Sequence, residues 1–470
     1  MRYLSTRGEA VAADFEEVLT AGLARDGGLF VPESYPVWEP GDIRALAGRS
    51  YAQAAERLIG PFVGDAIAAQ SLSRMIGLSY AAFRHPAVAP LAQIDANLFV
   101  LELFHGPTLA FKDVAMQLLG RMMDHVLRAK GERASVVGAT SGDTGAAAIE
   151  AFRGLDQVDI FILYPHGRVS DVQRRQMTCV DSANVHTIAI EGTFDDCQAI
   201  VKGLFNHHAF RDELKLSGVN SINWARVMLQ TVYYFTSAVA LGGPDRPVSF
   251  TVPTGNFGDV LAGWIARRMG LPIERLVVAT NENDILVRAL EKGIYEVRAV
   301  QATQSPSMDI QVSSNFERLL FEAYDRDAAA VRRLMGNLRQ AGRFEIGARE
   351  LARIRSDFDA YRTSEDETRE EIGRVWKEAG YLLDPHTAVA VHATRKALAR
   401  RPATPMIVLG TAHPAKFPQA VKAAAGLAPP LPPHLADLAS RTERFSVLAN
   451  DQSAVERFIR ARARAVGASA

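Results

Sequence analysis

The sequence predicts an α/β fold built on parallel sheets, because one pattern occurs three times: a short apolar strand, a loop of small or hydroxyl residues, and a helix. The three apolar runs end at Val137, Val252 and Leu409, and each leads directly into such a loop. Strands that alternate with helices form parallel sheets covered on both faces, and ligands bind at the carboxyl ends of those strands. We therefore expect the three loops to meet at one site.

Length and composition exclude several classes of protein. The chain has 470 residues, 53 Lys and Arg against 53 Asp and Glu, and 48% apolar residues. Zero net charge, without a stretch that is both basic and aromatic, argues against nucleic acid as a partner. No apolar run is long enough to span a bilayer, and residues 1–14 lack the apolar segment of a signal peptide. We expect a cytoplasmic protein with no membrane partner.

The two cysteines, Cys179 and Cys197, cannot form a zinc site or a disulfide framework by themselves. Such sparse cysteine usage fits a reducing compartment, and free thiols of this kind usually behave as small hydrophobes. We expect no metal site.

The chain divides into three parts. Helical spacing that is broken by Gly27 and Gly28 predicts an N-terminal unit of mixed structure over residues 1–85. The strand, loop and helix pattern places an α/β region over residues 86–440. A mildly basic helical segment, expected to be a solvated face, follows over residues 441–470.

Two segments interrupt the α/β pattern. Residues 315–380 are highly charged and helical, with Ser364 and Glu367 spaced as a capping box, so we expect an insertion of helices there. The proline-rich run 429–433 predicts a stiff, extended connector, because proline fixes φ and donates no hydrogen bond.

Each of the three loops ends at a predicted helix N-terminus, where unpaired backbone N–H groups favour an anion. The glycines at 255 and 258 would allow the backbone to approach a phosphate closely. The run matches neither the Walker pattern nor the dinucleotide pattern. Taken alone, it is either a phosphate cradle or a tight connection between a strand and a helix.

Lys112 is a candidate nucleophile because its neighbours in sequence are mostly apolar. A desolvated amine loses proton affinity and can attack an aldehyde, which is the requirement for a Schiff base. The alternative is that Lys112 extends to the surface beside Asp113.

The segment around Lys112 and the loops described above occur in the same order as the motifs of the threonine synthase family, and the chain resembles its longer members. These are fold type II pyridoxal-phosphate enzymes. The resemblance extends over almost the whole chain and implies two α/β lobes, as in the β subunit of tryptophan synthase, with a family-specific N-terminal domain. The segments that carry it are 3–8, 26–32, 105–116, 141–145, 255–259, 305–310, 380–388 and 410–417.

The resemblance implies a site for pyridoxal 5'-phosphate, with Lys112 carrying the cofactor and Thr411 facing its ring nitrogen. Because a threonine hydroxyl is a weaker proton donor than a carboxylic acid, the ring would be a mild electron sink. Asp143 stands where related enzymes often have asparagine, and it could contact the cofactor, contact the substrate or cap its helix. The implied cofactor-binding residues are Lys112, Asp143, Gly255, Asn256, Phe257, Gly258, Asp259 and Thr411.

The resemblance also implies O-phospho-L-homoserine as the small-molecule substrate. Ser141 and Thr144 would receive its carboxylate. Its phosphate would be held by Asn220, Ser221, Arg226 and Lys416. The planar guanidinium of Arg226 suits phosphate, although an ordinary ion pair is the alternative for both cations.

The implied activity is conversion of O-phospho-L-homoserine and water to L-threonine and phosphate, with Lys112 as general base. His105 and His413 are expected to orient loops. One alternative is a related fold type II lyase or dehydratase that acts on another hydroxy- or phospho-amino acid. Another is a non-catalytic cofactor-binding protein. We expect a monomer or weak homo-oligomer whose lobes close on the substrate.

Overall fold

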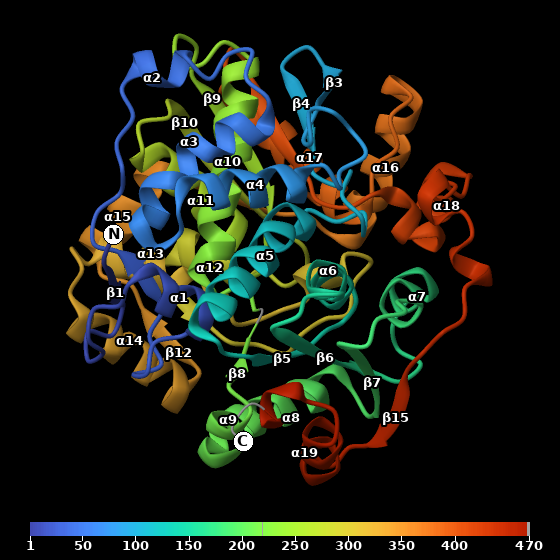
Figure 1. Cartoon of the computed structure of the whole chain (residues 1–470). Helices are drawn as coiled ribbons and strands as arrows, with labels where there is room; N and C mark the ends of the chain where they lie inside the picture. The colour runs from blue at the N-terminus through green and yellow to red at the C-terminus, as the bar shows by residue number, and fades with distance from the viewer. Residues whose placement is uncertain (219, 468–470) are drawn as a thin grey trace.

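The computed structural model describes residues 1–218 and 220–467, and two sheets form its core. In Figure 1 the five-stranded sheet occupies the lower part of the molecule and the six-stranded sheet the upper part. The strand orders are β15-β7-β6-β5-β8 and β13-β10-β9-β14-β4-β3, and every pairing is parallel except that of β3 with β4. The prediction of parallel sheets is therefore confirmed.

The five-stranded sheet and its helices form one lobe. Val136 of β5 packs into the main core, whereas the adjacent Val137 packs into a second core on the opposite face, because successive side chains of a strand alternate. Helices α5 and α6 pack against each other, and α8 packs against β5 and β6. The elements are β5 (Ala134–Ala139), β6 (Val158–Pro165), β7 (Val185–Glu191), β8 (Leu216–Ser217), α5 (Lys112–Lys130), α6 (Asp143–Phe152), α7 (Asp171–Thr178), α8 (Phe194–Asn206), α9 (His208–Glu213) and α10 (Trp224–Ala240).

The six-stranded sheet forms the second lobe and is also covered on both faces. Ile407 and Leu409 of β14 belong to the main core, whereas Val408 faces the core formed with α16 and α17. The elements are β3 (Leu91–Asp95), β4 (Leu98–Glu102), β9 (Val248–Pro253), β10 (Ile273–Thr280), β13 (Phe358–Arg362), β14 (Met406–Gly410), α11 (Gly258–Arg268), α12 (Ile285–Lys292), α16 (Glu365–Ala379), α17 (Pro385–Leu398) and α18 (Pro418–Ala425).

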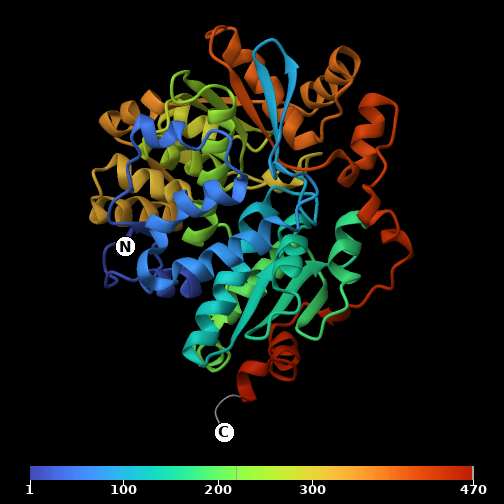
Figure 2. The same cartoon turned by 45° about the horizontal axis from the view of Figure 1, so that its top comes forward.

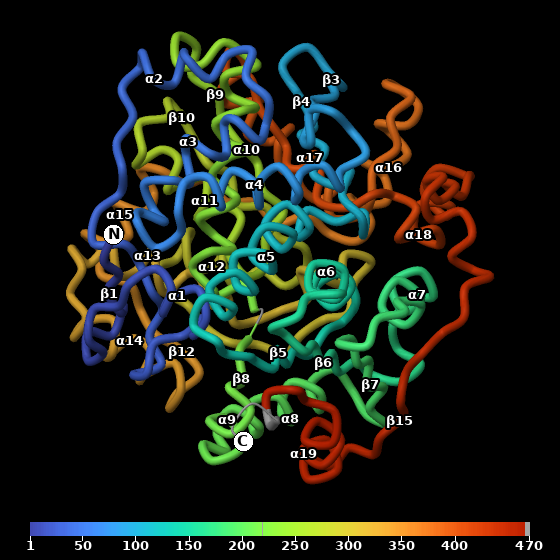
Figure 3. Tube along the Cα trace, viewed as in Figure 1, coloured from blue at the N-terminus to red at the C-terminus, as the bar shows by residue number. Residues whose placement is uncertain are grey.

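The N-terminal residues form a two-stranded ribbon and several helices. The trace of this N-terminal unit runs beside the segment of α13 and α14 in Figure 3. An ion pair joins the two parts, since Arg7 Nη2 lies 3.1 Å from Glu317 Oε2. The elements of this unit and of the segment beside it are β1 (Tyr3–Ser5), β2 (Phe30–Pro32), α1 (Phe15–Ala21), α2 (Pro40–Arg44), α3 (Tyr51–Val63), α4 (Ala69–Tyr80), α13 (Phe316–Ala323), α14 (Ala328–Ala341), α15 (Ala348–Asp357), β11 (Ile294–Glu296) and β12 (Arg343–Glu345).

The segment 315–380 is largely helical, but it also contains two short strands, β12 and β13, that the helical pattern concealed. β13 pairs in parallel with β10 at the edge of the six-stranded sheet. The Arg275 guanidinium fixes this edge, donating to Asp359 Oδ1 at 2.7 Å and to the Phe358 carbonyl at 2.8 Å. The capping box of Ser364 and Glu367 at the start of α16 is present.

The C-terminal segment crosses from one lobe to the other. Figures 1 and 2 show it running down one side of the molecule from α18 to β15 (Ser446–Ala449) and α19 (Gln452–Arg460). β15 extends the five-stranded sheet beside β7, so the segment is not purely helical. Arg464 Nε lies 2.6 Å from Asp159 Oδ1, and this contact attaches the segment to the first lobe. Residues 468–470, at the end of the predicted segment, lie outside the described residues.

Within the described ranges 1–218 and 220–467, no helix has the length and apolar character needed to cross a bilayer.

Candidate functional site

The Lys112 loop and the carboxyl ends of β5 and β14 meet between the two lobes. The Phe111 amide donates to the Thr411 carbonyl at 2.8 Å, and Ala110 forms a bridge with Ala412. Lys112 Nζ lies 3.7 Å from Asp143 Oδ2, at the start of α6. Two of the three loops predicted to share a site therefore meet at Lys112.

Lys112 is buried rather than extended to the surface. The residue is 9% exposed, and its ammonium lies 5.0 Å from the centre of the Phe111 ring. Burial lowers the pKa of Lys112, the charges of Lys416 and Arg226 lower it further, and Asp143 and Asp259 oppose the shift. The amine is therefore biased toward its neutral, nucleophilic form.

The loop before Lys112 is tightly constrained. The amide and the hydroxyl of Thr108 donate to the two carboxylate oxygens of Asp113, each at 2.7 Å. A Cβ on Gly106 would lie 2.5 Å from that of Asp113, so the contact requires glycine. Leu109 has a φ of 62°, a left-handed conformation that non-glycine residues rarely adopt. Burial raises the pKa of Asp113 to about 7.

The glycine turn 255–259 leads from β9 into α11 and has the shape of an anion cradle. Phe257, the N-cap of α11, has a φ of 63°. The Thr254 hydroxyl fixes the turn, because it donates to Asp259 Oδ1 at 2.5 Å and accepts from the Phe257 amide at 3.1 Å. A Cβ on Gly255 would lie 3.1 Å from Ile310. The first N–H groups of α11 have no intrahelical acceptor and suit a phosphate.

Asp143 is held by side chains from both lobes. Its carboxylate accepts from Gln173 Nε2 at 2.8 Å and from the Ser307 hydroxyl at 3.3 Å, and it forms an ion pair of 2.8 Å with Lys416. Burial alone would raise the pKa of Asp143, but Lys416 and Lys112 hold it well below its usual range. The N-cap of α6 is Gly142, without a side-chain hydrogen bond. Asp143 therefore does not cap α6 as its N-cap residue, and contact with the cofactor or the substrate stays a prediction.

Lys416, predicted to bind the substrate phosphate, is fully buried and already contacts two groups of the protein. Its Nζ donates to the Thr108 carbonyl at 2.7 Å in addition to pairing with Asp143. Its ammonium therefore joins the Lys112 loop to the start of α6.

The segment 220–226 lies beside the glycine turn. Asn315 connects the two, because its side chain donates to the Ser221 carbonyl at 3.1 Å and its amide donates to the Asn256 carbonyl at 3.1 Å. Arg226 is 4% exposed, and burial lowers its pKa to about 10, with Asp259 opposing the shift. Ser221 is half-buried and Asn220 is exposed.

The remaining predicted residues lie on the same loops. Ser141 and Thr144 are half-buried at the start of α6, and Thr411 is buried after β14. His413 accepts from the Ala415 amide at 3.1 Å, and His105 Nε2 lies 2.7 Å from Glu102 Oε2. The two histidines therefore contact loop and strand ends beside the site.

Sequence reasoning missed a group of polar residues that surround Asp143. The segments 305–310 and 380–388 were named only among the motifs that carry the resemblance, and no role was predicted for their residues. The structure places Ser307 on Asp143 and connects Ser307 to a buried pair, Asp384 and His386.

The residues present fit pyridoxal phosphate. The buried Lys112 amine suits its aldehyde, and the glycine turn, where a Cβ on Gly255 would press on Ile310 at 3.1 Å, suits its phosphate. Two further buried basic side chains, Lys416 and Arg226, are electrostatic neighbours of Lys112. Burial also raises the pKa of Asp259 to about 6, which further favours an anionic ligand.

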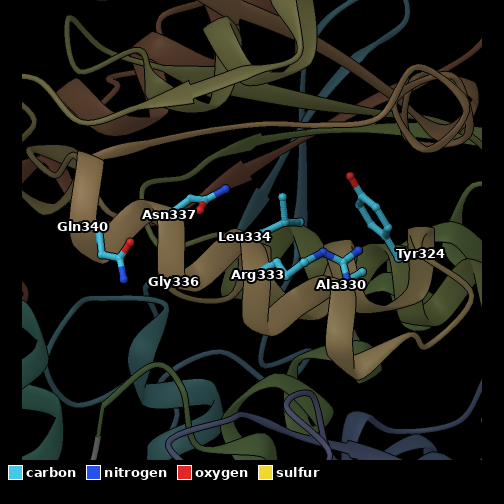
Figure 4. Close-up of a pocket in the computed structure, with 7 residues that line it drawn as sticks. All are labelled: Tyr324, Ala330, Arg333, Leu334, Gly336, Asn337 and Gln340. Carbon is cyan, nitrogen blue, oxygen red and sulfur yellow. The ribbon is translucent and has the colours of Figure 1, made fainter.

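A hollow elsewhere on the surface lies along α14, and Figure 4 shows its side chains. None of the predicted site residues lines it, and we assign it no role. Its lining residues are Tyr324, Ala330, Arg333, Leu334, Gly336, Asn337 and Gln340.

Three family models match the chain. "Threonine synthase N terminus" matches residues 2–80, "Pyridoxal-phosphate dependent enzyme" matches 83–410, and "Threonine synthase, C-terminal" matches 387–459.

Known proteins are similar over nearly the full length. A threonine synthase of Pseudomonas aeruginosa is 53% identical over 98% of each chain. A crystal structure of PLP-bound threonine synthase from Brucella melitensis has a TM-score of 0.96 and 61% identity, covering 99% of this chain and 100% of the other. The yeast threonine synthase structure has a TM-score of 0.93 and 40% identity, covering 98% of each.

Proposed function

Since the chain belongs to the threonine synthase family of pyridoxal-phosphate-dependent enzymes, we propose that it converts O-phospho-L-homoserine and water to L-threonine and phosphate. The observation that carries the proposal is a buried lysine amine whose electrostatic neighbours include two features suited to phosphate. The first feature is the glycine turn, whose last residue, Asp259, acts electrostatically on Lys112, and the second is Arg226. One suits the cofactor and the other suits the substrate.

Lys112, the glycine turn 255–259 and Thr411 would hold the cofactor. When bound, it supplies an electron sink for negative charge that develops on the substrate. Asp143 lies beside Lys112 and stabilises positive charge there.

Lys112 is the group that moves protons. Its Nζ removes the proton from Cα of the substrate and then one from Cβ. Burial favours the neutral amine that this role requires.

Arg226, with Asn220 and Ser221, holds the substrate phosphate as it leaves Cγ. A guanidinium already in place stabilises the negative charge that accumulates on the departing group. Lys416, paired with Asp143, balances the negative charge of that carboxylate beside the site. The Lys112 amine returns one proton to Cγ, which becomes the methyl group, and one to Cα, while water adds its hydroxyl at Cβ and gives up its other proton; the product is threonine.

The substrate carboxylate is received at the start of α6, by the hydroxyls of Ser141 and Thr144 and the first amides of the helix. This placement suits an anion, since a helix N-terminus presents unpaired N–H groups.

The proposal extends to organisation and setting. A threonine-synthase-type domain spans residues 1–85, the catalytic region spans 86–440 and the C-terminal segment spans 441–470. The enzyme acts in the cytoplasm in threonine biosynthesis, a branch of the aspartate-family pathway, as a monomer or weak homo-oligomer that binds neither nucleic acid nor membranes.

Product analysis tests the function. The purified protein is mixed with O-phospho-L-homoserine and pyridoxal phosphate, and phosphate, threonine and 2-oxobutanoate are measured in parallel. We expect equal amounts of phosphate and threonine. Phosphate accompanied by 2-oxobutanoate in place of threonine would favour the related lyase or dehydratase, and no phosphate release would contradict the proposal.

A further inference from the structure

A buried carboxylate and histidine stand at the start of α17, apart from the residues assigned a role above. Asp384 is 1% exposed and His386 is 3% exposed. The Asp384 carboxylate accepts from the His386 amide at 2.9 Å, and the same oxygen lies 2.9 Å from His386 Nδ1. Asp384 also accepts from the Thr387 hydroxyl. Its position is therefore fixed, and so is the orientation of the imidazole beside it.

The opposite nitrogen of the ring faces a backbone donor. The Ser307 amide lies 3.2 Å from His386 Nε2 and donates to it. A neutral imidazole carries one donor and one acceptor nitrogen. With a carboxylate at Nδ1 and an N–H at Nε2, the hydrogen belongs on Nδ1, and Nε2 is the acceptor.

The Ser307 side chain continues the chain of contacts into the site. Its hydroxyl donates to Asp143 Oδ2 at 3.3 Å, and the same oxygen lies 3.7 Å from Lys112 Nζ. Asp143 begins α6 in the lobe of the five-stranded sheet, whereas His386 begins α17 in the other lobe. The contacts thus cross between the lobes beside Lys112.

The ring of His386 is also held from the side. It lies 4.9 Å from the Phe417 ring, one residue after Lys416. The Thr387 hydroxyl accepts from the Thr411 amide at 3.3 Å. The start of α17 therefore supports the loop after β14 as well as the segment 305–310.

We propose that His386 is a positioning residue: oriented by Asp384, its Nε2 fixes the Ser307 backbone, which sets the Ser307 hydroxyl on Asp143 beside Lys112. The inference rests on the proposed function where it takes Lys112 as the amine that carries the cofactor. His386 acts through Ser307 and does not touch the reacting atoms.

Two substitutions of His386 distinguish the contribution of Nε2 from that of Nδ1. His386→Gln places an amide oxygen near the position of Nε2 and can accept from Ser307. His386→Asn keeps a polar group near Nδ1 but cannot reach Ser307. The control is His186→Gln, since His186 lies on β7 and its ring stacks on that of Phe161 of β6, with the ring centres 4.6 Å apart.

Hydrogen exchange of the Ser307 amide is the first measurement, made on the full-length holoenzyme. A backbone hydrogen bond contributes about 0.5–1.5 kcal/mol, or about three- to tenfold in an equilibrium constant. We expect exchange at Ser307 to be three- to tenfold faster in His386→Asn and close to wild type in His386→Gln and His186→Gln. Equal exchange in the wild type and His386→Asn, or equal loss in the Asn and Gln variants, would overturn the proposal.

The second measurement follows the bound cofactor by its visible absorbance as the pH is varied. Ser307→Ala keeps the amide but removes the donor to Asp143, so the carboxylate stabilises positive charge at Lys112 more strongly. We expect the titration midpoint to move to higher pH in Ser307→Ala and in His386→Asn, with kcat reduced three- to tenfold and KM little changed. If the midpoint of the pH titration in Ser307→Ala equals that of the wild type, Ser307 does not act on Lys112 through Asp143, and the proposal is overturned.

If a His386 variant fails to fold, Ser307→Ala still tests the contact between the Ser307 hydroxyl and Asp143, because it leaves His386 unchanged. Hydrogen exchange needs no substrate. Failure of the proposed reaction and failure of this inference are therefore distinguishable.

Discussion

Asp143 and Lys416 form a buried ion pair between residues 273 positions apart, with Oδ1 2.8 Å from Nζ and side chains that are 3% and 0% exposed. Lys112 lies on the other oxygen of the same carboxylate at 3.7 Å. One carboxylate therefore serves two buried lysines, and the shorter contact belongs to Lys416. This arrangement leaves the Lys112 amine as the less tightly paired of the two.

Asp143→Asn should strongly destabilise the protein, because it leaves the Lys416 ammonium buried without a carboxylate. Breaking a buried pair by removing one partner costs about 3–5 kcal/mol. Adding Lys416→Met should recover part of that loss, since the pair is then replaced by neutral groups. Urea unfolding of both single variants and the double variant checks this. Additive losses would show that the two residues do not act as a pair.

Lys112→Ala should abolish turnover and the visible absorbance of bound cofactor, because the variant lacks the amine that joins the cofactor and moves protons. General base catalysis alone contributes about 10²- to 10⁴-fold. The matched control is Lys377→Ala, which changes an exposed lysine on α16. Retention of both the absorbance and the activity in Lys112→Ala would contradict the assignment.

Arg226→Ala should weaken handling of O-phospho-L-homoserine while the bound cofactor remains. Hydrogen bonds to charged groups contribute about 1.5–3 kcal/mol, so kcat/KM should fall about tenfold to a hundredfold. Arg457→Ala serves as the control, because that side chain is 71% exposed on α19. Loss of the cofactor absorbance in Arg226→Ala would instead place Arg226 at the cofactor or in the support of the fold.

Gly255→Ala should lower the affinity for pyridoxal phosphate, because the added Cβ would lie 3.1 Å from Ile310 Cγ1 and 3.3 Å from Met308 Cα. Either the Ile310 side chain or the turn must then give way, and we expect the turn and its amides to move. Gly336→Ala is the control, since it lies within α14 and a Cβ there meets nothing within 4 Å. That variant should be slightly more stable, by up to about 1 kcal/mol. Cofactor titration by fluorescence measures both, and equal affinities would contradict the role of the turn.

The sequence indicated some local features of this site. The apolar neighbours of Lys112 left burial and a surface position both open, and the structure shows the residue buried, whereas the glycines at 255 and 258 predicted the turn between β9 and α11. These properties depend on residues close together in the chain. The family resemblance then supplied the roles that spacing alone leaves open.

Contacts between residues far apart in the chain could not be predicted from local sequence. Asp143 is contacted by residues 112, 173, 307 and 416, which the packing of two lobes brings together. Nothing in the local pattern around Lys416 distinguishes a partner of Asp143 from a ligand of phosphate. The strands β13 and β15 were missed for a related reason, because each is short and completes a sheet formed elsewhere.

Asp259→Asn should remove a pH dependence from the stability of the protein. Burial raises the pKa of Asp259 from 3.8 to about 6, although Thr254 and the Val260 amide donate to it. The unfolded chain therefore releases this proton near pH 4, whereas the folded protein retains it until about pH 6. Between these values the folded state binds more protons, so stability falls as the pH rises.

The size of this effect follows from the shift, at about 1.4 kcal/mol for each pH unit, or about 3 kcal/mol in all. In Asp259→Asn, the remaining Oδ1 can still accept from Thr254 and Val260, so the fold of the turn is kept. The free energy of unfolding of the variant, relative to wild type, should therefore rise from pH 4 to pH 6 and stay constant above it. Urea unfolding at matched cofactor concentration measures this, with the exposed Asp366→Asn as control. A constant difference across that range would show that Asp259 does not hold its proton in the folded protein.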